Sequence, residues 1–256
     1  DKIPVFVICQ EFLDALPVHV FEKTAEFGWR ERLVDVAIQE DPDDLARTKY
    51  VNAESEAVLA NKKKPRLRYV IPPDTTPALR TLLMQQQQNK DEMKQLGEVG
   101  DIIEVCPQAL MFAQDIASII EECDGAGLFI DYGNEGAGDT LRAFSKHEQV
   151  HVLSKPGQVD VTADVDFSAL ARAVNSFSDR GVEAFGPIVQ GKFLTAMGIV
   201  DRLEQLAHLI ETEEQGDQLV EAAERLVDPD QMGVRYKVMA IGKRRENGVP
   251  PAAFDP

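Results

Sequence analysis

Long apolar runs are missing from this sequence of 256 residues. No window of about 18 apolar residues occurs, and a membrane-spanning helix needs such a window, so we expect no transmembrane helix. The apolar runs at 5–9 and 128–130 have the length of strands. Because 44% of the residues are apolar, the chain can still bury one sizeable core.

Positive charge and cysteine are both scarce. The 27 lysines and arginines are outnumbered by 44 acidic residues, and the formal net charge is −17. Such an acidic surface repels phosphate, so we expect no nucleic-acid binding; it suits a cationic partner, although acidity also serves solubility alone. The three cysteines, Cys9, Cys106 and Cys123, are too few and too widely spaced for a disulfide framework or a zinc site. A reducing compartment is therefore expected.

Several catalytic signatures are also missing. The sequence contains no G-x-S-x-G, no Walker A and no H-E-x-x-H motif. Gly133, Gly136 and Gly138 stand in the wrong order for a dinucleotide-binding fingerprint. His147 and His151 are four residues apart, but no neighbouring ligand completes a metal spacing. We therefore expect no metal site.

The chain does contain alternating strand and helix patterns. Strands are predicted at 4–9, 29–36, 66–71, 101–106, 125–133, 182–188 and 235–241, helices at 76–87, 110–122, 166–174, 193–197, 203–210 and 217–227, and a turn or short helix at 139–144. This alternation predicts an α/β fold with a mostly parallel sheet. The first strand is apolar on both faces, so we expect it to be fully buried, whereas the last should be antiparallel and at or near an edge.

We expect a single domain over 1–256 that carries a small inserted β/helical region at 18–105 on the substrate side. Within that region, 40–65 is highly charged and poor in aromatic residues, which predicts a flexible loop. The proline-containing tail at 243–256 is expected to be loose. Because the chain opens with Asp1 just before a strand, without a signal peptide or presequence, we expect that upstream residues are missing from it.

Polar residues follow two of the apolar strands. Glu11 and Asp14 come directly after the first strand, and Asp131, Tyr132 and Gly133 end the strand that contains the LFI run. Since ligands bind at the carboxyl ends of strands in open α/β sheets, we expect the two groups to form opposite sides of one cleft. Two carboxylates can hold a guanidinium. The alternatives are an ordinary helix start for the first group and a strand end with a turn glycine for the second.

Two further side chains near the first group are candidates for the site. Phe12 can present its π face to a cation, either a sulfonium or a guanidinium. His19 follows a Leu-Pro turn and is either a base of the site or a packed or capping histidine.

Eight segments, taken in order, resemble one known family. They are EFLDALPVHVF at 11–21, GWRERLVDV at 28–36, EVCP at 104–107, LFIDYG at 128–133, DTLRAF at 139–144, DVTADVDFSAL at 160–170, GPIVQGKFLTAMGI at 186–199 and RLVDPDQMGVRYKVMAI at 225–241. In these segments the chain is similar to the MidA-like S-adenosylmethionine-dependent methyltransferases. That family includes a mitochondrial assembly factor of respiratory complex I that methylates an arginine.

The resemblance implies a class I methyltransferase-like (Rossmann-like) fold. It implies S-adenosylmethionine as cofactor, but the family's E-x-G-P-G-x-G-T-type cofactor loop is absent from this chain, so the fold should be incomplete at the N-terminus and this piece should bind the cofactor weakly or not at all. It implies a protein arginine as acceptor, in eukaryotes on a core subunit of complex I in the mitochondrial matrix, with a bacterial cytoplasmic origin and a homodimer left open. The alternative is a non-catalytic assembly module on the same fold.

The resemblance also assigns roles to residues. Glu11 and Asp14 are the expected catalytic pair, which holds the acceptor guanidinium. The expected substrate-binding residues are Phe12, His19, Asp139 and Arg142, and the expected cofactor-binding residues are Gln10, Asp131, Tyr132 and Gly133. The chain departs from the family pattern at Gln10, where Asn or His is usual, and at Leu13, where Phe is usual.

Overall fold

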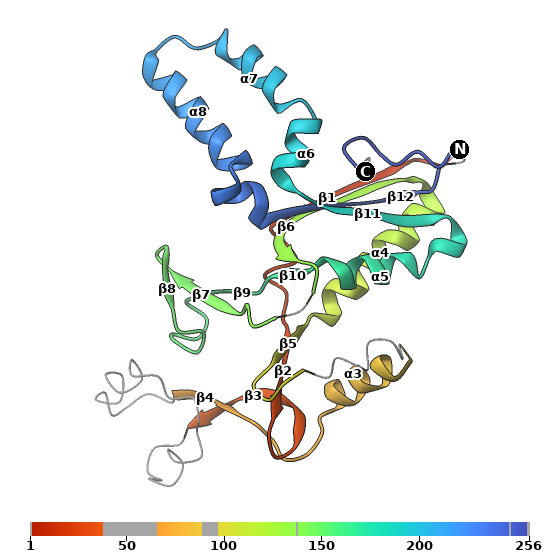
Figure 1. Cartoon of the computed structure of the whole chain (residues 1–256), viewed down its shortest axis with the longest axis vertical. Coiled ribbons are helices and arrows are strands. Elements are labelled where there is room, and N and C mark those ends of the chain that lie inside the picture. The colour runs from red at the N-terminus through yellow and green to blue at the C-terminus, as the bar shows by residue number, and fades with distance from the viewer. Residues whose placement is uncertain (1, 38–65, 89–96, 137, 246, 255–256) are drawn as a thin grey trace. The chain divides into compact units, whose positions relative to one another are not determined.

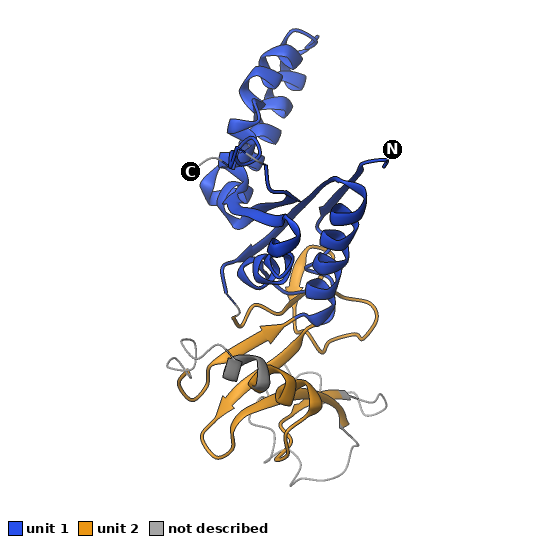
Figure 2. Ribbon diagram, turned by 90° about the vertical axis from the view of Figure 1, so that its right-hand side faces the viewer, with its two compact units in different colours: residues 1–17, 106–137, 162–256 blue, residues 18–105, 138–161 orange. Residues whose placement is uncertain are grey.

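The computed structural model describes residues 2–37, 66–88, 97–136, 138–245 and 247–254 (Figure 1). The chain divides into two compact units, which Figure 2 colours separately: unit 1 is formed by 1–17, 106–137 and 162–256, and unit 2 by 18–105 and 138–161. The region expected to be inserted, 18–105, thus falls within unit 2, which also takes in 138–161. Of the loop expected at 40–65, nothing lies within the described residues.

Unit 1 is built on a five-stranded sheet. Its strands are β1 (Val5–Gln10), β6 (Gly125–Asn134), β10 (Val165–Asp166), β11 (Val182–Val189) and β12 (Tyr236–Lys243), in the order β1-β6-β12-β11 with β10 also paired to β6. Strand β6 is parallel to β1 and β10, whereas β12 is antiparallel to both β6 and β11. Four strands therefore run in one direction, and β12 alone opposes them. The predicted α/β fold with a mostly parallel sheet is confirmed, and β12 lies one strand in from the β11 end.

Strand β1 is less buried than its sequence predicts. Phe6 and Ile8 are 74% and 72% exposed, and only Cys9 of this strand is buried. Within the described residues β1 pairs with β6 alone, so it is an edge strand of the sheet. Helix α4 (Pro107–Cys123) packs against the face of β1 opposite to Phe6 and Ile8. The expectation of a strand buried on both faces is therefore wrong for this chain.

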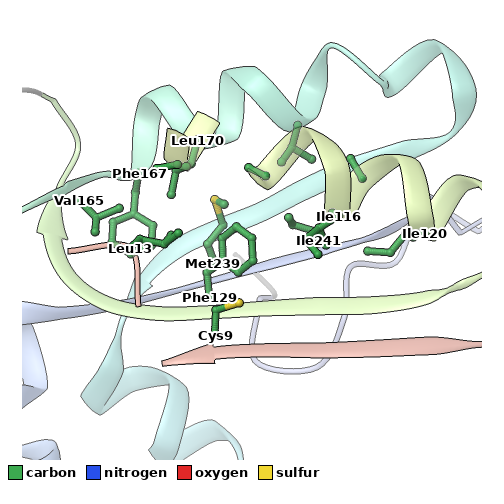
Figure 3. Packing of buried hydrophobic residues seen from close by; sticks show 14 of the residues in the cluster. Cys9, Leu13, Ile116, Ile120, Phe129, Val165, Phe167, Leu170, Met239 and Ile241 are labelled. Carbon is green, nitrogen blue, oxygen red and sulfur yellow. The ribbon is translucent and has the colours of Figure 1, made fainter. Parts of the chain in front are cut away.

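Two helices, α4 and α5 (Phe167–Asn175), pack on the sheet, and the main apolar core lies between them and the strands (Figure 3). Helix α4 directs apolar side chains at helical spacing into this core, and Ala113, Ile116 and Ile120 are nearly inaccessible. Helix α5 begins at Asp166, whose carboxylate accepts the N–H of Ala169, as expected of an N-cap. The core includes Leu13, Phe129, Val165, Phe167, Leu170, Met239 and Ile241.

Three more helices lie between β11 and β12: α6 (Gln190–Ala196), α7 (Ile199–Ala207) and α8 (Glu213–Val227). Both ribbon views show α7 and α8 extending away from the sheet of unit 1 (Figures 1 and 2). Short helical turns at Ser178–Arg180 and Pro229–Gly233 complete the unit. In the part of the chain that the structure describes, no helix combines the length and the apolar character needed to cross a membrane.

Unit 2 contains an antiparallel sheet in the order β4-β3-β2-β5. The strands are β2 (His19–Thr24), β3 (Gly28–Ala37), β4 (Arg66–Val70) and β5 (Ile102–Val105), and the described residues of this unit also form helix α3 (Pro77–Gln88). A second, three-stranded sheet has the order β8-β7-β9, with β7 (Arg142–Ser145), β8 (Glu148–Val150) and β9 (Asp160–Thr162). The turn or short helix expected at 139–144 is wrong, because β7 obtains its hydrogen bonds by pairing with β8.

The described part of the tail is packed rather than loose. Arg244 pairs with Glu183, and the ring of Phe254 lies 5.9 Å from that of Phe193. The aromatic side chain near the end of the tail explains why its proline content did not keep it free.

Candidate active site

The residues after β1 form a tight loop. Glu11 has a φ of 46°, in the left-handed region, and the N–H of Leu16 donates to the carbonyl of Leu13 at 3.2 Å. No helix begins here, so the alternative reading of Glu11 and Asp14 as a helix start is wrong. A loop directly after a strand places its side chains at the carboxyl end of the sheet.

A buried carboxylate holds this loop in place. Asp131, in β6, is 1% exposed, and β6 is the direct neighbour of β1. Its Oδ2 accepts the N–H groups of Phe12, Leu13 and Asp14 at 3.2, 3.0 and 3.3 Å. Its Oδ1 accepts the N–H of Tyr132 at 3.0 Å. The two predicted groups of residues are therefore adjacent in space.

The Asp131 carboxyl titrates far from its ordinary range. Burial first, and then the charge of Asp14, raise its pKa to about 7, although the backbone donors of the loop lower it in part. Asp14 itself is only 7% exposed. A buried acid whose pKa is raised by a second buried acid beside it is more typical of a functional site than of a packed core.

Two tyrosines complete the cluster. The Tyr132 hydroxyl donates to Oδ2 of Asp14. Tyr236, at the start of β12, pairs directly with Tyr132 across the sheet, and the two rings meet edge to face at 5.5 Å. Burial first, and then the nearby Glu11 carboxylate with its hydrogen bond, raises the pKa of Tyr236 to about 12. Each tyrosine thus accompanies one of the two carboxylates.

Tyr236 and its neighbour Arg235 were not among the residues expected from the sequence. The exposed Arg235 guanidinium lies over the Tyr132 ring, 5.8 Å from its centroid. The sequence signal was the strand pattern RYKVMAI, but the pattern does not say that this strand lies beside β6. Only that neighbour relation brings these two side chains to the site.

Three other expected residues of unit 1 lie close by in the chain. Gln10 is exposed at the end of β1. Phe12 is 44% exposed, and its ring lies 5.1 Å from that of Phe112. Gly133 is buried, and a Cβ at this position would overlap the carbonyl oxygen of Val165. The close approach of β10 therefore accounts for that glycine on structural grounds.

The remaining expected residues, His19, Asp139 and Arg142, belong to unit 2. His19 contacts Glu31 through its Nδ1 at 2.6 Å, and Arg142 donates to the carbonyl of Thr140 at 3.0 Å. Their part in substrate binding stays a prediction. Among the described residues of either unit, no group of three His, Cys, Asp or Glu side chains is arranged to hold a metal ion.

Comparison with known proteins identifies the family. A family model described as "Putative S-adenosyl-L-methionine-dependent methyltransferase" matches residues 1–188. Among curated proteins, the chain is 34% identical over 251 residues to the mitochondrial protein arginine methyltransferase NDUFAF7 of Xenopus tropicalis, covering 97% of this chain and 49% of the relative. It is 35% identical over 237 residues to the human protein of that name, covering 92% and 45%. The chain thus spans about half the length of the curated relatives it matches.

Solved structures confirm the fold. A protein from Burkholderia thailandensis superimposes with a TM-score of 0.66 at 24% identity, over 99% of this chain and 58% of that one. A second crystal structure from the same organism, bound to S-adenosyl-homocysteine, gives a TM-score of 0.65 at 23% identity, over 99% and 56%. The fold and the match of the family model agree with the resemblance in the sequence. The chain belongs to the family of S-adenosyl-L-methionine-dependent methyltransferases.

Proposed function

We propose that this chain is the acceptor-side part of a protein-arginine N-methyltransferase that uses S-adenosylmethionine. The observation that carries the proposal is the pair of carboxylates, Glu11 and Asp14, presented by one loop that the buried Asp131 holds. The names of the curated relatives support an arginine as acceptor. The word mitochondrial in the same names supports a mitochondrial location. From the family resemblance of the sequence alone we propose the matrix as compartment and a core subunit of complex I as substrate during its assembly.

The described residues suit the charged end of the donor. A sulfonium is stabilised by nearby carboxylates, and the loop after β1 offers Asp14, whose carboxylate the Tyr132 hydroxyl holds by a hydrogen bond. Gln10 would contact that end, and Tyr132 would act through its hydrogen bond to Asp14. Asp131, with both oxygens bonded to backbone N–H groups, would act only through the loop. When bound, the donor supplies an electrophilic methyl group.

The chain's own contribution would be positioning and electrostatics. Glu11 and Asp14 would bind two nitrogens of the acceptor guanidinium and turn the third toward the methyl group. The phenol of Tyr132 fixes the orientation of the Asp14 carboxylate in advance, so no reorganisation is needed during the reaction. Glu11 is exposed and would take the proton released from the methylated nitrogen and pass it to water.

A methyl-transfer assay with the longest natural protein that contains this sequence tests the proposal. With labelled S-adenosylmethionine and complex I core subunits as acceptors, Glu11→Gln should lower kcat by about 10²–10³, as for the loss of one charged group in the transition state. Glu122→Gln, on the exposed side of α4, removes the same charge away from the loop and should leave the rate unchanged. Wild-type turnover by Glu11→Gln would exclude this role.

A calorimetric titration separates the enzyme from a non-catalytic assembly module on the same fold. If it is an enzyme, the same natural protein should bind S-adenosylmethionine at micromolar concentration. Binding of complex I subunits without any binding of millimolar S-adenosylmethionine would support the module instead.

A further inference from the structure

The Tyr132 ring already carries a guanidinium in the described structure. Arg235 precedes β12 by one residue, and its guanidinium carbon lies 5.8 Å from the ring centroid. Within the described ranges Arg235 has no carboxylate at ion-pair distance, although the protein carries 44 acidic residues. The contact with the ring is therefore what places this side chain.

The surroundings of Tyr132 favour a cation on its face. Its hydroxyl donates to the carboxylate of Asp14, which shifts electron density into the ring and adds a negative charge nearby. The edge-to-face contact with Tyr236 fixes the orientation of the ring. Glu11, which interacts with the Tyr236 hydroxyl, adds a second negative charge to the same cluster.

We propose that the face of Tyr132 is a guanidinium-binding subsite, and that Arg235 occupies it until an arginine side chain of another polypeptide replaces it. The ligand class is an alkylguanidinium, which combines a planar cation with donors for Asp14 and Glu11. This subsite rests on the proposed function only for its place in the reaction, because binding of a guanidinium needs no methyl donor.

Arg235 is easily displaced for two reasons. It is exposed, and a cation–π contact at an exposed site is worth only about 0.5–1 kcal/mol, which is about a two- to fivefold preference for the docked position. An occupant with that preference weakens a competing ligand by one plus the same ratio. Removing the Arg235 guanidinium should therefore tighten binding of an external guanidinium about three- to sixfold.

Titration of the 256-residue protein with methylguanidine tests the subsite, followed by NMR of isotope-labelled tyrosine rings. The sequence has four tyrosines, so Tyr132 can be assigned from the signal that Tyr132→Phe lacks. We expect the Tyr132 signals to shift, and the dissociation constant to fall about three- to sixfold in Arg235→Gln. Because Arg235 is exposed and its only described partner is the ring, this variant should fold.

Arg202→Gln is the matched control, since it removes one positive charge from α7 in the same unit. It should leave the methylguanidine affinity unchanged. An equal gain in Arg202→Gln, no gain in Arg235→Gln, or shifts confined to the other three tyrosines would each overturn the subsite. If methylguanidine binds as expected but the unmutated natural protein that contains this sequence shows no methyl transfer, the proposed function is contradicted and the subsite is not.

Discussion

The two units bury different kinds of side chain. In unit 1 the core is a large apolar cluster around Phe129, and its buried acids, Asp14 and Asp131, lie together at one end of the sheet. Unit 2 has a small apolar cluster of Phe21, Trp29 and Leu79, and its buried glutamates are distributed over three strands. These glutamates are Glu22, Glu31 and Glu104, each 6% exposed.

The partners of these acids differ as well. Glu22 pairs with Arg32 at 3.0 Å, and Glu31 contacts His19 at 2.6 Å. In unit 1, neither Asp14 nor Asp131 has an ion-pair partner among the described residues, and the charge of Asp14 helps to raise the pKa of Asp131. Acids that are each paired with a cation hold a sheet together, whereas two neighbouring acids without ion pairs at one end of a sheet are typical of a ligand site. The contrast supports a site in unit 1.

The largest expected effect on stability comes from the apolar core of unit 1. Phe129→Ala should lower the free energy of unfolding by about 3–5 kcal/mol, because this fully buried ring leaves a cavity. Chemical denaturation followed by far-UV circular dichroism measures the loss. Met111→Ala, on a residue of α4 that is 64% exposed, should cost less than about 0.5 kcal/mol. Equal losses in both variants would contradict the assigned core.

Asp131, which has no ion-pair partner among the described residues, should make the free energy of unfolding depend on pH. Because the folded pKa of Asp131 is raised to about 7, its ionisation costs stability increasingly as the pH rises from about 4 to 7. Asp131→Asn does not titrate, so its stability relative to wild type should improve over that range by up to about 4 kcal/mol. Urea unfolding at several pH values measures the difference, and a difference independent of pH would show that Asp131 is not perturbed.

The third buried glutamate of unit 2, Glu104, has hydrogen bonds in place of an ion pair among the described residues, and it should respond to their loss. Glu104 accepts the N–H groups of Thr140 and Leu141 at 3.1 and 2.8 Å, and the Thr140 hydroxyl at 2.5 Å. Glu104→Ala should cost about 1–3 kcal/mol, and Glu104→Gln, which keeps an acceptor and the shape, clearly less. Fluorescence of Trp29, the only tryptophan and a member of unit 2, follows the unfolding. Equal costs for both variants would show that the hydrogen bonds contribute little.

An exposed ion pair should contribute least to the free energy of unfolding. Arg180 lies 3.1 Å from Glu121 and is 60% exposed, so Arg180→Ala should change the free energy of unfolding by less than about 1 kcal/mol. Thermal unfolding at low and high salt measures it. A loss as large as that of Glu104→Ala would remove the distinction between buried and surface charge.

Local patterns in the sequence were enough for most elements. The helical spacing of Ala113, Ile116 and Ile120 predicted α4, and the cap at Asp166 predicted the start of α5, because both signals act within a few residues. The LFI run predicted β6 with its polar end. The family resemblance then supplied the fold of the whole.

Long-range relations could not be read from those patterns. The Tyr236 side chain reaches Tyr132 only because β12 inserts between β6 and β11, and strand order depends on contacts between distant segments. The role of Asp131 in walling the cofactor site stays a prediction, and no pattern in the sequence indicated that its carboxylate accepts the N–H groups of Phe12 and Leu13. The segment 138–161 joins unit 2 through strands too short to show a pattern.

A double-mutant cycle on methyl transfer tests most directly whether Glu11 and Asp14 hold one guanidinium. Glu11→Gln and Asp14→Asn are compared singly and together in the longest natural protein that contains this sequence. We expect each single variant to lose about 10²–10³ in kcat, and the double variant to lose little more, since both act on one group. Losses that multiply fully in the double variant, or wild-type turnover in either single one, would contradict a shared acceptor site.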